Sequence, residues 1–275
     1  MTTVVHNIPL NLVSAYRGRE VIVRSPDPAE LVKAIPESDL GKIVGVQILS
    51  LTVDVDPLAD WGYAIPVELV MQDPQGEFPL LYRHAKLLDK HPVRASIPVV
   101  PGFSKAVKVA NSLQFTVKLE VGQPEPAAIE ELLAVLDFYL HQSSVSQPIE
   151  FFHTSLASFY DRAPVTLWDV QEEDPAYIRY MTDDGRETIA RRLVAESVTG
   201  DIDYFAADLW AGLLAERSEC CGCEFFENCG GYFKAPLKDY DCDGVKTVFR
   251  ALKDAAAELR RDLDAFKESS KEASL

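Results

Sequence analysis

Apolar runs rich in β-branched residues alternate with helix-like stretches over the first 153 residues of the chain. Six runs have the length and composition of strands, and they cover residues 21–25, 43–53, 65–71, 94–100, 114–121 and 148–153. Helix-like stretches lie between them, including residues 80–90, 104–113 and 129–140. Strands that alternate with such helices form parallel sheets, because each crossover returns the chain to the same edge. The sequence therefore predicts an α/β fold whose functional loops lie at the carboxyl ends of the strands.

Three helices have clear signals at their ends or along one face. Asp27 is a predicted N-cap, with Pro28 as the first helical residue. The helix over residues 129–140 has one apolar face, formed by Ile129, Leu132, Leu133, Leu136 and Leu140. A final helix begins at Asp243, and we expect its apolar face to pack on the rest of the protein. That face contains Val245, Val248, Phe249, Leu252, Ala256, Leu259 and Leu263.

The alternation weakens between residues 165 and 208, where acidic residues gather. They are Asp169, Glu172, Glu173, Asp174, Asp183, Asp184 and Glu187. We interpret this segment as a solvated surface of loops and helices. Docking of a basic peptide or partner is the alternative interpretation.

The charge of the chain excludes several classes of partner. It has 27 Lys and Arg against 43 Asp and Glu, a net charge of −16. Such a chain gains nothing from contact with phosphates, so we expect neither nucleic acid nor an anionic membrane as a partner. No run approaches the roughly 20 apolar residues of a membrane span, and residues 1–20 lack the pattern of a signal peptide. The sequence predicts a cytoplasmic protein.

Five cysteines lie within 23 consecutive positions, after 219 residues that contain none. Four of them have the spacing Cys220-x2-Cys223-x5-Cys229-x12-Cys242. Cys221 is the fifth, and Cys220 and Cys221 could exchange roles. In a reducing compartment, clustered thiols indicate a metal site and not disulfides. Four thiolates suit either a tetrahedral zinc ion or a closed iron–sulfur cubane, and the spacing does not separate the two.

The residues between these cysteines fit a metal site. We expect Gly222, Gly230 and Gly231 to provide the backbone angles that wrap the chain around it. Three aromatic residues are expected to shield the site from water, with stacking against a substrate as the alternative. They are Tyr232, Phe233 and Tyr240.

The run from Cys220 to Cys242, followed by the helical sequence VKTVFRALKDAAAELRRDL, resembles the SPASM-type region of radical SAM enzymes that modify peptides. In that family, a C-x2-C-x5-C core and a later cysteine help to bind an auxiliary cubane. The resemblance implies a [4Fe–4S] cluster with a ligand set that consists of Cys220, Cys223, Cys229 and Cys242. Residues 83–110, 115–140 and 147–156 resemble the latter part of a radical SAM (β/α) barrel.

The chain also departs from that family. It has no cysteine before Cys220, so the C-x3-C-x2-C motif of the catalytic cluster is absent, as is the GGE motif of the SAM-binding strand. The resemblance therefore implies a partial or degenerate (β/α) barrel over residues 1–208 and a small cysteine-rich, cluster-binding subdomain over residues 209–275. It implies an accessory protein that partners a radical SAM subunit in peptide or natural-product maturation, by electron relay or by holding the substrate.

Two other functions are compatible with the residues. One is a non-catalytic binding or scaffold protein with a structural four-cysteine zinc site. The other is a stand-alone enzyme whose cluster has three cysteine ligands and one open iron that acts as a Lewis acid.

Charged residues also occur in the predicted strands and at their ends. Lys118 and Glu120 lie in one strand, and Glu150 and His153 end another. We expect ion pairs and hydrogen bonds at a barrel rim, with a remnant ligand pocket as the alternative.

Overall fold

The computed structural model describes residues 4–195 and 202–272, and these contain nine strands in a single sheet. The strands are β1 (Val5–Pro9), β2 (Val21–Ser25), β3 (Ile43–Ile48), β4 (Val67–Val70), β5 (Val93–Pro98), β6 (Thr116–Glu120), β7 (Ile149–Glu150), β8 (Ile178–Met181) and β9 (Glu187–Thr188). Their order is β7-β6-β5-β4-β3-β2-β1-β8-β9. Every neighbouring pair is parallel except β8 and β9, which are antiparallel.

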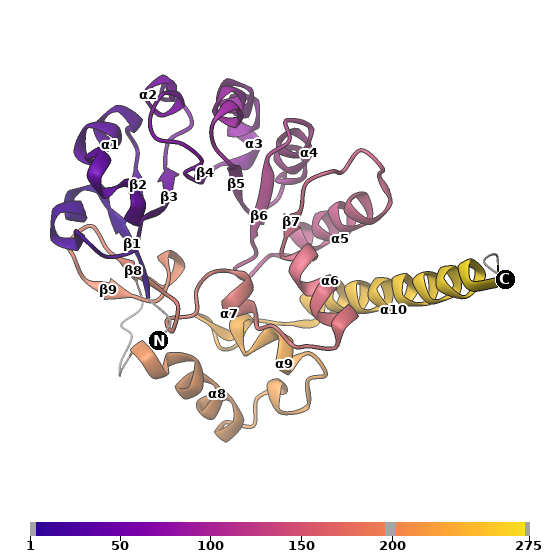
Figure 1. The fold of residues 1–275 in the computed structure, drawn as a ribbon. Coiled ribbons are helices and arrows are strands. Elements are labelled where there is room, and N and C mark those ends of the chain that lie inside the picture. Colours follow the sequence, from indigo (N-terminus) through magenta and orange to yellow (C-terminus); the bar gives the residue numbers. More distant parts are fainter. Residues whose placement is uncertain (1–3, 196–201, 273–275) are drawn as a thin grey trace.

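The sheet curls but does not close. Within the described residues, β7 pairs only with β6 and β9 pairs only with β8, so the sheet is open between these edges (Figure 1). This confirms the predicted α/β class and the parallel arrangement of the strands.

Helices surround the outside of the curled sheet (Figure 1). Those of the first half are α1 (Pro28–Ala34), α2 (Asp56–Ala59), α3 (Pro74–Glu77), the 3-10 helix η3 (Phe78–Asp89), α4 (Ser104–Ser112) and α5 (Pro126–His141). Those of the second half are α6 (Phe152–Asp161), α7 (Leu167–Val170), α8 (Phe205–Ala215), α9 (Phe226–Cys229) and α10 (Asp243–Glu272). Asp27 caps α1, because its Oδ1 accepts a hydrogen bond from the Ala29 amide at 2.8 Å, and Pro28 is the first helical residue, as predicted.

Two strand predictions were too long. The strand predicted over residues 148–153 covers only Ile149–Glu150, because Phe151 has a φ of +85° and α6 begins at Phe152. Both phenylalanines are buried, and Phe151 packs edge-on against Phe249 of α10. The run predicted over residues 43–53 leaves the sheet after Ile48.

The prediction for residues 165–208 was wrong in one respect. This segment is not only loops and helices, because it provides β8, which pairs with β1, and β9. These strands are four and two residues long and carry polar side chains such as Arg179 and Glu187, so they lack the apolar runs of the other strands.

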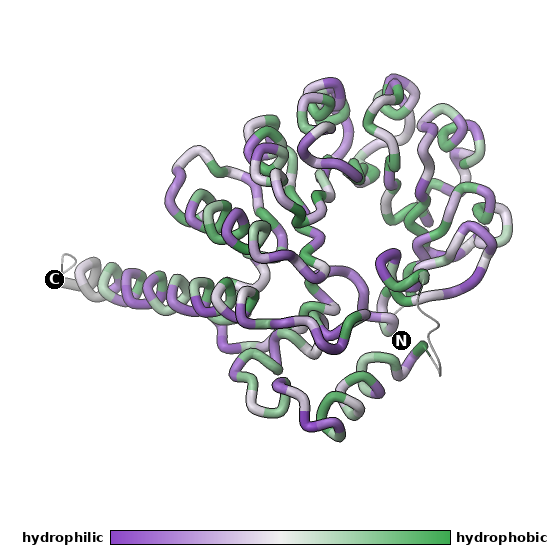
Figure 2. The backbone as a smooth tube through the Cα atoms, turned by 180° about the vertical axis from the view of Figure 1, so that it is seen from behind, coloured by the Kyte–Doolittle hydropathy of each residue, from purple (hydrophilic) through white to green (hydrophobic). Residues whose placement is uncertain are grey.

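The main hydrophobic core lies between the sheet and the surrounding helices. Outward-facing strand residues such as Val23, Val46, Leu69, Ile97 and Leu119 are buried there. Figure 2 shows hydrophobic and hydrophilic residues alternating along much of the chain that forms the curled sheet. The inward-facing positions are largely polar, in contrast to the layers of branched apolar residues that fill a closed (β/α) barrel.

Helix α10 packs on α6 and α5 through its first half. Val245, Val248 and Phe249 are buried, as predicted. Leu259 and Leu263 lie on the same predicted face but are 42% and 38% exposed, because the helix extends past its neighbours (Figure 1). No helix in the described part of the chain is both long and apolar enough to cross a membrane.

We predict that Phe249→Ala lowers the free energy of unfolding by about 3–5 kcal/mol, because it leaves a cavity among packed rings. Phe249 stacks on Phe225 at 5.3 Å and contacts Phe151, Phe159 and Phe233 edge-on. Urea unfolding followed by tryptophan fluorescence measures the change. The matched control is Phe266→Ala on the same helix, where the side chain is 68% exposed and the loss should be small. Equal losses in the two variants would contradict this account of the packing.

Candidate functional site

Four of the five cysteines line one pocket beside the first turns of α10. Cys220 lies in the 3-10 helix η6 (Glu219–Gly222), and Cys223 follows that helix directly. Cys229 is the last residue of α9, and Cys242 precedes α10. Two short helices and the start of a long helix thus bring together residues that are up to 22 positions apart in the sequence.

The fifth cysteine faces away from this cysteine pocket. Cys221 is exposed, and its Sγ lies 3.7 Å from the Leu214 carbonyl oxygen and 3.9 Å from that of Leu213. The sequence left open whether Cys220 or Cys221 belongs to the site. The structure places Cys220 in the pocket.

The cysteines surround the pocket and do not meet at a point. Among the described residues, no three His, Cys, Asp or Glu side chains are placed so that they could hold one metal ion. Tetrahedral zinc would hold its four sulfurs only about 3.8 Å from one another. In a cubane each thiolate binds a different iron, so a set of four thiolates is chemically suited to either group. The open space at the centre is about 20 Å³, little more than a water molecule needs, so the cysteine side chains must turn outward to admit a cubane.

The wall of the pocket is mainly aromatic, with a charged rim. The apolar lining consists of Phe225, Phe226, Phe233, Val245 and Phe249. At the rim, Lys234 donates a hydrogen bond of 2.6 Å to Glu219, and Lys246 also pairs with Glu219. Hydrogen bonds from these two lysines lower the pKa of Glu219 to about 2. Glu219 therefore stays ionised between the two lysines at neutral pH.

Two consecutive glycines direct backbone amides toward Cys229. Gly230 and Gly231 have φ values of +60° and +72°, and a helical residue such as Cys229 followed by a left-handed one forms a concave arrangement of N–H groups that attracts anions. A Cβ on Gly231 would lie 2.7 Å from Cδ1 of Leu213, so the position requires glycine. Gly222 has no positive φ, so that part of the prediction was wrong.

Burial and backbone amides act in opposite directions on the thiols. Burial raises the pKa of Cys229 to about 11, although hydrogen bonds from the amides of Phe233, Tyr232 and Gly231 act to lower it. Burial also raises the pKa of Cys242 to about 12. Metal binding to these residues therefore has to release protons from the thiols.

The aromatic residues between the cysteines have different positions. Phe233 lines the pocket, and Tyr240 stacks on Phe233 at 6.2 Å. Tyr232 is fully buried on the other side, against Trp168 and the guanidinium of Arg192. Phe225 and Phe226 lie between the same cysteines and also line the pocket, but the sequence pattern did not predict this.

The cysteine-rich segment is attached to the carboxyl ends of the strands near the open side of the sheet. Gln123, just beyond β6, donates a hydrogen bond of 2.8 Å to the Phe233 carbonyl oxygen. Trp168 of α7 donates one of 2.9 Å to the carbonyl oxygen of Gly230. The cysteine pocket therefore lies at the edge of the sheet where α/β proteins place their functional loops.

A continuous polar network crosses the lumen, which is the space inside the curled sheet. Asn7 donates to Gln47 at 3.0 Å, and Gln47 donates to Glu68 at 3.2 Å. Arg94 bridges Glu68 at 2.7 Å and Glu172 at 2.6 Å, and Lys118 donates to Glu172 at 2.7 Å. Glu172 comes from the loop after α7, so this carboxylate connects the open side of the sheet to β5 and β6.

The charged members of this network stay ionised at neutral pH. Burial tends to raise the pKa of Glu172, but the attraction of Lys118 and Arg94 outweighs it and holds the pKa well below its ordinary value. The same pairing raises the pKa of Lys118 despite its burial. The prediction that the acidic segment is only a solvated surface was therefore wrong for Glu172, and also for Glu173, which pairs with Arg192 at 2.8 Å.

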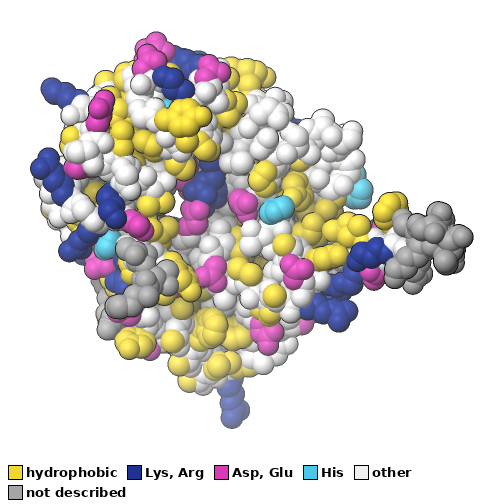
Figure 3. All heavy atoms as spheres, in the orientation of Figure 1, with side chains coloured by type: hydrophobic (Ala, Val, Ile, Leu, Met, Phe, Trp, Pro, Cys, Tyr) yellow, Lys and Arg dark blue, Asp and Glu magenta, His cyan; other side chains and the backbone are white. Residues whose placement is uncertain are grey.

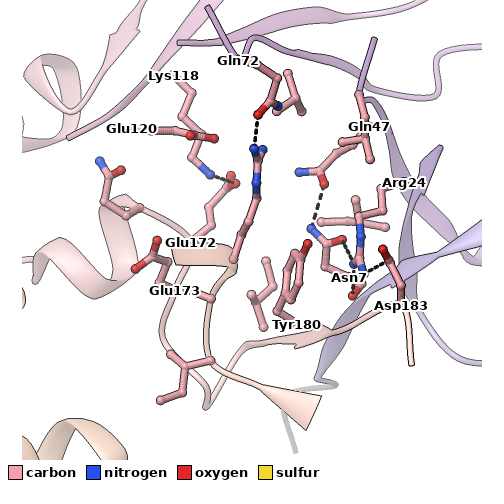
Figure 4. Close-up of a pocket in the computed structure, with 18 residues that line it drawn as sticks. Asn7, Arg24, Gln47, Gln72, Lys118, Glu120, Glu172, Glu173, Tyr180 and Asp183 are labelled. Carbon is pink, nitrogen blue, oxygen red and sulfur yellow. Dashed lines mark hydrogen bonds and ion pairs between the residues drawn. The ribbon is translucent and has the colours of Figure 1, made fainter. Parts of the chain in front are cut away.

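A cavity of about 370 Å³ lies beside this network, toward the carboxyl ends of the strands. We call it the lumen cavity. Asn7, Arg24, Gln47, Lys118, Glu120, Glu172, Glu173, Tyr180 and Asp183 line it (Figure 4). Figure 3 shows basic and acidic side chains together near the centre of this face. The sequence pointed to Lys118 and Glu120 but not to Arg24 or Gln47. The available signal was a polar residue inside an otherwise apolar strand.

The hydrogen bonds predicted for the rim are present. Glu120 accepts one of 2.7 Å from Ser96, and Glu150 accepts one of 2.7 Å from Thr154. The Nδ1 of His153 lies 3.0 Å from the hydroxyl oxygen of Tyr139.

Comparison with known proteins gives no match: no family model, no curated protein and no solved structure is significantly similar to this chain.

We predict that Glu172→Gln lowers the free energy of unfolding at neutral pH by about 1–3 kcal/mol, because Arg94 and Lys118 lose their shared anion. The pKa of Glu172 is lower in the folded chain than in the unfolded one. Its contribution is therefore complete above the unfolded pKa and is lost as the pH falls. Urea unfolding at several pH values between about 7 and 3 should show a shallower acid-dependent loss in the variant.

The matched control is Glu216→Gln, which removes an exposed ion pair with Lys238. Its effect should stay below about 1 kcal/mol. If Glu172→Gln and Glu216→Gln had the same effect, the network would not stabilise the open side of the sheet.

Proposed function

We propose that this chain is an accessory iron–sulfur protein that partners a radical SAM subunit in the maturation of a peptide or natural product. One [4Fe–4S] cluster would be held by Cys220, Cys223, Cys229 and Cys242. The observation that carries the proposal is the position of these four cysteines around one pocket, while Cys221 faces away.

The surroundings of the cysteine pocket support this cofactor. When bound, a cubane supplies one-electron transfer. Phe225, Phe226 and Phe249 would exclude water from it, which tunes its potential. The amides that face Cys229 and the ammonium groups of Lys234 and Lys246 would stabilise the negative charge of the thiolates.

The composition of the chain supports an accessory role. With no cysteine before Cys220, the chain cannot hold a second, three-cysteine cluster, so SAM cleavage would take place on the partner subunit. The net charge of −16 favours a partner with a complementary basic surface. The division at residue 208 and the cytoplasmic location stay predictions.

A structural zinc site is the second candidate. The small open space of about 20 Å³ favours a single ion over an eight-atom cluster. In that case the four cysteines would only fix the cysteine-rich segment to the start of α10, and the chain would be a binding or scaffold protein.

Metal analysis of anaerobically purified and reconstituted chain separates the two candidates. We expect about four irons and four sulfides per chain in the wild type and a loss of both in Cys223→Ala. Cys221→Ala is the matched control and should keep the full content, because this thiol lies outside the pocket. One zinc without sulfide would overturn the cluster. A cluster that survives in Cys242→Ala would instead indicate three cysteine ligands and an open iron.

The partner is tested separately with a radical SAM protein encoded beside this chain and carrying C-x3-C-x2-C. We expect the two proteins to elute as one complex in anaerobic size-exclusion chromatography. Separate elution of a chain that contains its full cluster would contradict the accessory role. It would not contradict the proposal that the chain binds a cluster.

A further inference from the structure

The lumen cavity contains charged residues that the cysteine pocket does not use. Most of the charged side chains that line it are paired: Arg24 with Asp183, Lys118 with Glu172, and Glu173 with Arg192. These pairs satisfy one another and leave no net charge directed at a ligand.

Glu120 and Arg191 are the exceptions among the described residues. The carboxylate of Glu120 accepts a hydrogen bond from the Ser96 hydroxyl at 2.7 Å but makes no ion pair. The guanidinium of Arg191 donates to the neutral side chain of Gln72 and also makes no ion pair. One unpaired anion and one unpaired cation thus line the same cavity.

We propose that the lumen cavity binds a small zwitterion of the α-amino-acid class. Arg191 would bind its carboxylate and Glu120 its ammonium group. The volume of about 370 Å³ is at the small end of the range for ligand pockets, which suits a free amino acid better than a long peptide. The site lies at the carboxyl ends of parallel strands, where α/β proteins bind ligands. The proposal does not depend on which metal the cysteines hold.

Isothermal titration of the full chain, in the metal state in which it is isolated, tests the proposal with each standard L-amino acid as the probe. We expect at least one to bind at millimolar concentration or below. Its N-acetyl derivative lacks the ammonium group and its carboxamide lacks the carboxylate. Each should therefore bind about tenfold more weakly or worse.

Two variants assign the charges to residues. Glu120→Gln should weaken binding of the free amino acid about tenfold or more and leave that of the N-acetyl derivative unchanged. Arg191→Gln should weaken binding of the free amino acid similarly and leave that of the carboxamide unchanged. Neither substitution breaks an ion pair, so both variants should fold, which circular dichroism checks. The control is Arg186→Gln, since Arg186 bonds to the Val194 carbonyl oxygen and does not line the cavity.

Three results would overturn the proposal. They are the absence of binding by every amino acid at millimolar concentration, equal affinity for the free and the derivatised forms, and unchanged affinity in both variants. None of them bears on the metal content, so a failure here is distinct from a failure of the proposed cluster.

Discussion

The ion pairs between Glu172 and the two cations Arg94 and Lys118 hold the open side of the sheet together. No strand ladder joins the edge strands β7 and β9 in the described part of the chain, so backbone hydrogen bonds do not close this side. Glu172 reaches the lumen from the loop between α7 and β8, and it connects that loop to β5 and β6. A buried charge without its partner is costly. The three charges together therefore stabilise this arrangement of the two strands and the loop.

This network also determines what the lumen can contain. A closed (β/α) barrel fills its interior with branched apolar side chains, whereas the corresponding positions here carry Gln47, Glu68, Arg94 and Lys118. Polar side chains with fixed partners cannot collapse onto one another as aliphatic ones do, so space is left at the carboxyl ends of the strands. The hydrophobic core lies outside the sheet and carries most of the packing, which leaves the lumen free for polar contacts.

Local patterns in the sequence predicted the elements that depend on local interactions. Such patterns predicted the alternation of strands and helices, the Asp27 cap and the start of α10. The spacing of the cysteines likewise predicted that four thiols lie around one site. The end of β7 at Glu150 could not be predicted, because α6 starts where Phe151 packs on Phe249 of α10 in the tertiary structure. The inward position of Glu172 depends on Lys118 and Arg94, which are 54 and 78 positions away in the sequence. Polar residues within apolar strands are a sequence signal of the polar lumen. Only Lys118 and Glu120 were singled out on that basis.

Arg192 connects the two candidate sites through direct contacts. Its guanidinium pairs with Glu173, which lines the lumen cavity, and lies 4.0 Å from the ring centroid of Tyr232. It also donates to the carbonyl oxygen of Ala235. Tyr232 in turn precedes Phe233, whose ring lines the cysteine pocket. Because these groups are largely buried, their electrostatic interactions are screened less than those at the surface. Arg192 therefore provides an unbroken series of contacts from Glu173 in the lumen cavity to Tyr232 and Ala235 of the cysteine-rich segment.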